Sequence, residues 1–197
     1  MTLGKSFAVI ALAAGITLLS GCQTVDYYAP ESMAGILVTS GSRGFNDIAE
    51  LSPSRSVAMR LLIFPRPDSE MRIWFSLPRG DSLRFKQSSF QFQGRTGNPI
   101  TVRMPEIRGN HVENGIGHIV AYASEQVLPG DTYRVKTPFG KYIDANRQFE
   151  IIVALPADLP DEFALTFPEF ELNGIRYHYP PINYSLKSGR DYKSAPW

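Results

Sequence analysis

The chain has a single cysteine, Cys22, and almost no net charge. One cysteine cannot form an intrachain disulfide or a cysteine-based metal site, so stability has to come from packing. Twenty basic residues against 19 acidic ones give a formal net charge of +1. Balanced, interspersed charges lack the basic surface that nucleic-acid binding requires, so we expect no nucleic-acid partner.

Motifs of catalysis and cofactor binding are also missing from the sequence. There is no His-Glu-x-x-His, no Gly-x-Ser-x-Gly and no phosphate-binding loop. Gly115-Ile116-Gly117 begins like a dinucleotide fingerprint, but Val120 occupies the third glycine position and a strand pattern follows. We therefore expect no cofactor and no metal, and we favour a protein that is not an enzyme.

The N-terminal segment has the pattern of a signal peptide. Lys5 precedes an uncharged stretch, whose apolar part runs over the 14 residues 7–20. A helix that crosses a bilayer core needs about 20 such residues, whereas 14 are typical of a signal-peptide core. The segment ends in Leu19-Ser20-Gly21-Cys22, which resembles the lipobox of bacterial lipoproteins at all four positions.

The resemblance to lipoproteins implies cleavage between Gly21 and Cys22 and lipidation of Cys22. The Cys22 thiol would be diacylated and the new amino terminus acylated, and two or more acyl chains anchor a protein stably to a membrane. Lipoproteins retained in the inner membrane often carry Asp after the cysteine, whereas here the next residue is Gln23. We therefore expect membrane lipid as a partner and the bacterial cell envelope, with the outer membrane favoured, as the location.

The chain divides into four predicted parts. Residues 1–21 are the signal peptide, residues 22–32 a lipidated tether, residues 33–187 one folded domain and residues 188–197 a polar tail. Cleavage would leave 176 of the 197 residues, which is about one domain.

Short runs of alternating apolar residues dominate the predicted domain. Met59, Leu61 and Ile63 share one parity, and Ile73 and Phe75 continue the pattern after a Pro-rich break. The mature chain has no window of 11 or more residues with helical spacing of apolar groups. About ten short strands predict an all-β fold, a single β-sandwich that resembles immunoglobulin-like domains, with a closed β-barrel as the alternative.

The most detailed local prediction concerns a hairpin near the C-terminus. Asn173-Gly174 is the preferred pair for a two-residue type I′ turn, in which both residues adopt positive φ. Such a turn places Leu172 opposite Ile175, Glu171 opposite Arg176, Phe170 opposite Tyr177 and Glu169 opposite His178. One face of the hairpin would then be apolar and point into the core.

Three residues are candidates for contact with a ligand. His111 and Glu113 lie in the Gly- and Asn-rich segment 109–115, which we interpret as a loop between strands. Trp74 has the opposite parity from its apolar neighbours, so it lies on the other face of its strand, where an exposed aromatic side chain can contact a protein or a sugar. His118 shares parity with apolar neighbours and is expected to point inward.

A second candidate is the turn Arg79-Gly80-Asp81, which with Ser82 matches the integrin-binding tetrapeptide. Its place between two strands predicts an exposed turn, and turns of this composition commonly have only a structural role.

These observations favour a membrane-anchored, non-enzymatic envelope lipoprotein that binds another envelope component, most simply a protein, as an assembly or accessory subunit. Two alternatives stay open. One is an envelope hydrolase or carbohydrate-active enzyme whose carboxylates meet only in the folded chain, and the other is a surface adhesin that uses the Arg79 turn.

Overall fold

The computed structural model describes residues 24–41, 43–65, 67–113 and 116–190. All the regular secondary structure in these ranges consists of β-strands, so the predicted all-β fold without long helices is confirmed. No helix in the described ranges is long and apolar enough to cross a membrane. The predicted signal peptide and Cys22 lie outside the described residues.

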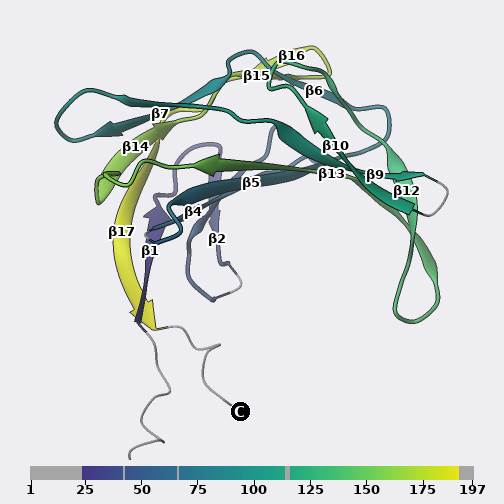
Figure 1. Ribbon diagram of the computed structural model, residues 1–197, viewed down its shortest axis with the longest axis horizontal. Coiled ribbons are helices and arrows are strands. Elements are labelled where there is room, and N and C mark those ends of the chain that lie inside the picture. The colour runs from purple at the N-terminus through teal and green to yellow at the C-terminus, as the bar shows by residue number, and fades with distance from the viewer. Residues whose placement is uncertain (1–23, 42, 66, 114–115, 191–197) are drawn as a thin grey trace, which may run out of the picture.

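The strands form three antiparallel sheets (Figure 1). A five-stranded sheet has the order β1 (Thr24–Pro30), β17 (Ile182–Arg190), β14 (Glu162–Thr166), β7 (Ser89–Gly94) and β8 (Ile100–Arg103). A four-stranded sheet has the order β11 (Leu128–Pro129), β6 (Ser82–Phe85), β15 (Phe170–Leu172) and β16 (Ile175–Tyr177).

An eight-stranded sheet contains most of the remaining chain. Its order is β10 (Ile116–Tyr122), β9 (Ile107–Glu113), β13 (Tyr142–Ala154), β5 (Glu70–Leu77), β4 (Met59–Phe64), β3 (Ile48–Leu51) and β2 (Ile36–Thr39), with β12 (Thr132–Lys136) paired to β13. The first half of β13 pairs with β12, and from Arg147 onward it pairs with β5.

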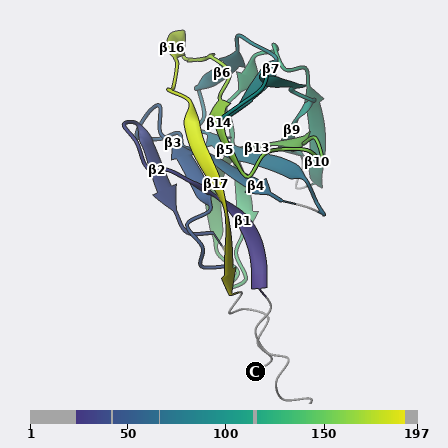
Figure 2. The same cartoon turned by 90° about the vertical axis from the view of Figure 1, so that its left-hand side faces the viewer.

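One core fills the space between the sheets, as the alternation predicts. Met59, Leu61, Ile63, Ile73 and Phe75 are all buried, so they form the inner face of the eight-stranded sheet. Phenylalanines of the other two sheets and their connections complete this core: Phe85, Phe90, Phe92, Phe163, Phe167 and Phe170. The predicted sandwich is therefore confirmed, with sheets that are strongly curled (Figures 1 and 2).

The predicted tether is wrong for residues 24–30, and the predicted polar tail is wrong for residues 188–190. Strand β1 pairs with β17 along its whole length, from Thr24 opposite Arg190 to Pro30 opposite Tyr184. Tyr28 is buried, and its ring lies 5.2 Å from that of Phe163, edge to face. The strand was missed because its partner is more than 150 residues away in the sequence.

The C-terminal hairpin has the predicted register. Leu172 pairs with Ile175, and Asn173 and Gly174 have φ of 54° and 79°. Two details differ from prediction. Ile175 is 60% exposed, because β16 is the edge strand of its sheet. The paired strand ends at Tyr177, before His178, and Glu169 lies 3.6 Å from Arg176 instead.

Candidate functional site

The face of the eight-stranded sheet opposite the core carries a row of charged side chains with one tryptophan in the middle. The antiparallel register places Glu50 opposite Arg60, Arg60 opposite Trp74, Trp74 opposite Glu150, and Glu150 opposite Arg108. The neighbours of Trp74 in the chain, Ile73 and Phe75, are buried in the core. Trp74 therefore lies on the outer face, as its parity predicts, and is half-buried there.

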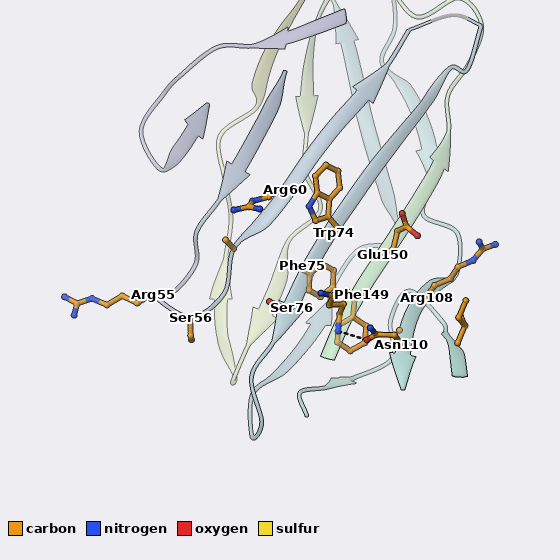
Figure 3. A pocket seen from close by; sticks show the side chains of 14 residues that line it. Arg55, Ser56, Arg60, Trp74, Phe75, Ser76, Arg108, Asn110, Phe149 and Glu150 are labelled. Carbon is orange, nitrogen blue, oxygen red and sulfur yellow. Dashed lines mark hydrogen bonds between the residues drawn. The ribbon is translucent and has the colours of Figure 1, made fainter. Parts of the chain in front are cut away.

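A groove with a volume of about 660 Å³ runs over this row (Figure 3). Trp74, Ser76, Gln148 and Glu150 of the central strands β5 and β13 line its middle. Two further sets of lining residues come from opposite sides of the sheet: Arg55 and Ser56 from the connection between β3 and β4, and Arg108, Asn110 and Ile119 from β9 and β10. The outer face is therefore concave.

Arginine gives the groove its polar character. The Nε atom of Arg60 lies 2.9 Å from Glu50, and the Nε atom of Arg108 lies 3.5 Å from Glu106. Both contacts are made through Nε, and a guanidinium has five N–H donors. Arg60 and Arg108 thus keep donors for a second partner, and both side chains are more than half exposed.

A single carboxylate, that of Glu150, is found among the described residues that line the groove. Glycoside hydrolysis by the usual mechanism needs two carboxyl groups that flank the bond to be cleaved. No cluster of three or more His, Cys, Asp or Glu side chains that could hold a metal ion occurs in the described part of the chain. The groove is suited to binding by shape, stacking and hydrogen bonds.

His111 does not belong to the groove. Residues 107–113 are strand β9, so the predicted loop is wrong over 109–113. His111 shares parity with Gly109, a buried residue beside Phe149, and faces Arg147. His118 lies opposite His111, on the face of β10 that its parity predicts, but it is exposed and is therefore not a core residue.

The partner of His111 is a buried arginine. The Nη2 atom of Arg147 contacts Nδ1 of His111, its Nη1 atom donates to the Tyr122 hydroxyl at 3.3 Å, and Asp131 lies 3.7 Å away. A guanidinium can only donate, so Nδ1 of His111 is the acceptor. These contacts join three strands and favour a structural role for His111. The side chain of Glu113 lies outside the described residues.

The Arg79-Gly80-Asp81 turn is exposed at Arg79 and Gly80, and Gly80 has φ of 90°. Its aspartate, however, is part of a contact between turns. The Asp81 carboxylate accepts a hydrogen bond from the Asn173 side chain at 2.9 Å, and the Asp81 carbonyl accepts one from the Gly130 backbone at 2.7 Å. Asp81 therefore helps to fix the C-terminal hairpin, which favours the structural interpretation of this turn.

Arg55, Arg60 and Arg108 were not among the candidates of the sequence analysis. The alternation places Arg60 and Trp74 on outer faces, but only the strand register makes them neighbours. No family model, curated protein or solved structure matches the chain. A functional assignment therefore depends on the groove itself.

Proposed function

We propose that this protein is a lipid-anchored component of the bacterial cell envelope that binds another envelope protein through the groove around Trp74, without catalysis of its own. The anchor is Cys22, for which the resemblance to lipoproteins provides the argument. The observation that carries the proposal of binding is the groove, where a half-buried tryptophan lies among exposed arginines on the outer face of the eight-stranded sheet.

The composition of the groove supports a protein partner. Tryptophan and arginine are enriched among the residues that contribute most to protein–protein affinity. Ile119, on the rim, is 77% exposed and adds an apolar contact. A partner segment can pack on Trp74 and Ile119 while its carboxylates or carbonyls accept hydrogen bonds from Arg60 and Arg108.

Site-specific photocrosslinking in the native host tests this proposal. The probe is a photoreactive amino acid at Ile119, and the control is the same amino acid at Leu37. Leu37 is 57% exposed, and the register places it in the same cross-strand row as Trp74, but it does not line the groove. We expect a discrete crosslinked protein from position 119 and none from position 37.

A variant of the tryptophan makes the test specific. Trp74→Ala should lower the yield of the position 119 crosslink by at least about tenfold, because loss of a central aromatic contact commonly costs this much affinity or more. Leu37→Ala should leave the yield unchanged. Equal crosslinks from positions 37 and 119, or a product that is insensitive to Trp74→Ala, would show that the groove is not the binding site.

A further inference from the structure

The hairpin of β12 and β13 projects beyond the rest of the eight-stranded sheet (Figure 1). Among the described residues, its strands pair there with each other alone: Arg134 lies opposite Asp144, Val135 opposite Ile143 and Lys136 opposite Tyr142. Every residue from 134 to 144 is exposed except Thr137, which is half-buried. This segment therefore contributes almost nothing to the core.

A well-defined turn closes the hairpin and presents an aromatic side chain at its apex. The Gly140 backbone donates to the Thr137 carbonyl at 2.9 Å, and the Thr137 backbone donates to the Lys141 carbonyl at 2.7 Å. Pro138 suits the second position of such a turn, and Gly140 takes the positive φ, 75°, that closes it. Phe139 lies between them and is 91% exposed.

The hairpin tip combines apolar and basic side chains. Tyr142 is 62% exposed, and Val135 and Ile143, which face each other across the strands, are also exposed. Residues 134–144 contain three basic side chains, Arg134, Lys136 and Lys141, and one acidic one, Asp144. Exposed aromatic and aliphatic groups next to lysines are typical of segments that bind the interface of a bilayer with anionic lipids.

The tip lies on the same lower side of the molecule as the start of β1, across the long axis from it (Figure 1). Figure 1 shows the beginning of β1 at the lower left and the β12–β13 hairpin reaching down to a similar level at the lower right. The proposed lipidated residue, Cys22, is only two residues before Thr24, the first residue of β1. A membrane that holds Cys22 would therefore lie on the side toward which the tip of the hairpin projects.

We propose that the β12–β13 hairpin is a second membrane contact, in which Phe139 and Tyr142 enter the interfacial layer of the bilayer and Lys136 and Lys141 bind anionic headgroups. The inference rests on the proposed lipidation of Cys22. A single lipid anchor lets a domain rotate about the point of attachment, whereas a second contact sets its orientation. The position of the tip on the same lower side of the molecule as the anchor favours a lipid surface over a protein as its partner.

Fluorescence from a single position tests the contact. The full, acylated protein is incorporated into vesicles of phosphatidylethanolamine with about one quarter phosphatidylglycerol as the anionic lipid. Cys22, the only native cysteine, is blocked by acylation, so Phe139→Cys can be labelled with an environment-sensitive fluorophore. The matched control is Ile175→Cys, an exposed apolar residue on the β15–β16 hairpin at the opposite end of the molecule (Figures 1 and 2).

We expect a blue-shifted emission at position 139 and quenching by spin-labelled lipid at least about three times that at position 175. Charge reversal of Lys136 and Lys141 to Glu should reduce this difference in anionic vesicles. If the protein is bound to the vesicles but the fluorophore at position 139 shows the same emission and quenching as the one at position 175, the hairpin contact is overturned and the proposed anchor is not affected. Shielding that occurs only in native envelope membranes would overturn it in favour of a protein partner.

Flotation of the vesicles separates the anchor from the hairpin. The acylated protein should float with the vesicles, and the Cys22→Ser variant, which lacks the acyl chains, should remain largely in the soluble fraction. Equal flotation of the two would show that Cys22 is not the anchor. Failure of the unmodified sequence to be acylated and to float would overturn the proposed anchor and the hairpin contact together.

Discussion

Gly109 lies in β9 where two aromatic rings close over the backbone, and its replacement by alanine is a quantitative test of how β9 and β10 are held on the sheet. The rings of Tyr122 and Phe149 meet edge to face, with centroids 5.9 Å apart. An added Cβ at position 109 would lie 2.9 Å from a ring carbon of each. Both rings are buried, so neither can turn away into solvent.

The magnitude follows from two opposing effects. Overpacking of a filled core costs about 1–3 kcal/mol. Alanine restricts the unfolded chain and recovers about 0.4–1 kcal/mol. Gly109→Ala should therefore lower the free energy of unfolding by about 1–2 kcal/mol, or the melting temperature by roughly 2–8 °C in a domain of this size.

Gly117 provides the matched control in the same hairpin. It lies in β10 opposite Val112, is exposed, and has no atom within 4 Å of an added Cβ. Gly117→Ala should leave stability unchanged or raise it by up to about 1 kcal/mol. Urea titrations followed by circular dichroism compare the two variants with the wild type. If Gly109→Ala is as stable as Gly117→Ala, the two rings do not enclose β9 as described, and the wall of the groove formed by β9 and β10 is not fixed by them.

Two other stability predictions follow from buried polar groups. The Tyr184 hydroxyl is buried without a hydrogen-bond partner among the described residues. Tyr184→Phe should therefore raise the free energy of unfolding by about 1 kcal/mol in the same urea titrations. A variant that is less stable than the wild type would contradict this prediction. Burial raises the pKa of the Asp47 carboxyl above its usual range, although hydrogen bonds such as the one from the Gly41 backbone lower it in part. The folded state therefore binds this proton more tightly, and the resulting stability is present below the unfolded pKa and lost as the pH rises through the folded pKa. Asp47→Asn keeps the acceptor oxygen without the charge, so it should be more stable than the wild type at neutral pH. This difference in stability should narrow as the pH falls through the raised folded pKa and stay constant below the unfolded pKa of about 4; a difference that widens in acid would refute the sign.

Much of the fold could be predicted because it depends on local patterns. Alternation identified the buried face of β4 and β5, and Asn173-Gly174 identified a turn and its register from two residues alone. Strand β1 could not be found in this way. It is short, it contains Asp26 and Pro30, and it exists because residues 184–190 of β17 pair with it from the other end of the chain.

The site was predicted only in part, for a related reason. Parity placed Trp74 on an outer face, but the neighbours that form the groove come from five other segments of the chain, and their positions depend on register and on the curl of the sheet. His111 was chosen because glycine and asparagine surround it. Those residues lie within a strand, where Gly109 makes room for two rings and the Asn110 side chain accepts a hydrogen bond from the Gln148 backbone at 2.7 Å.

Strand β13 connects the two proposed contacts of the protein. Tyr142, at one end, belongs to the hairpin tip, and Glu150, eight residues later, lines the groove. At about 3.3 Å per residue, the two lie roughly 26 Å apart along the strand. Arg147 lies between them, where β13 changes partners from β12 to β5, and its contacts with His111, Tyr122 and Asp131 hold the hairpin to β9 and β10. Arg147 thus links the base of the hairpin to the two strands that form one wall of the groove.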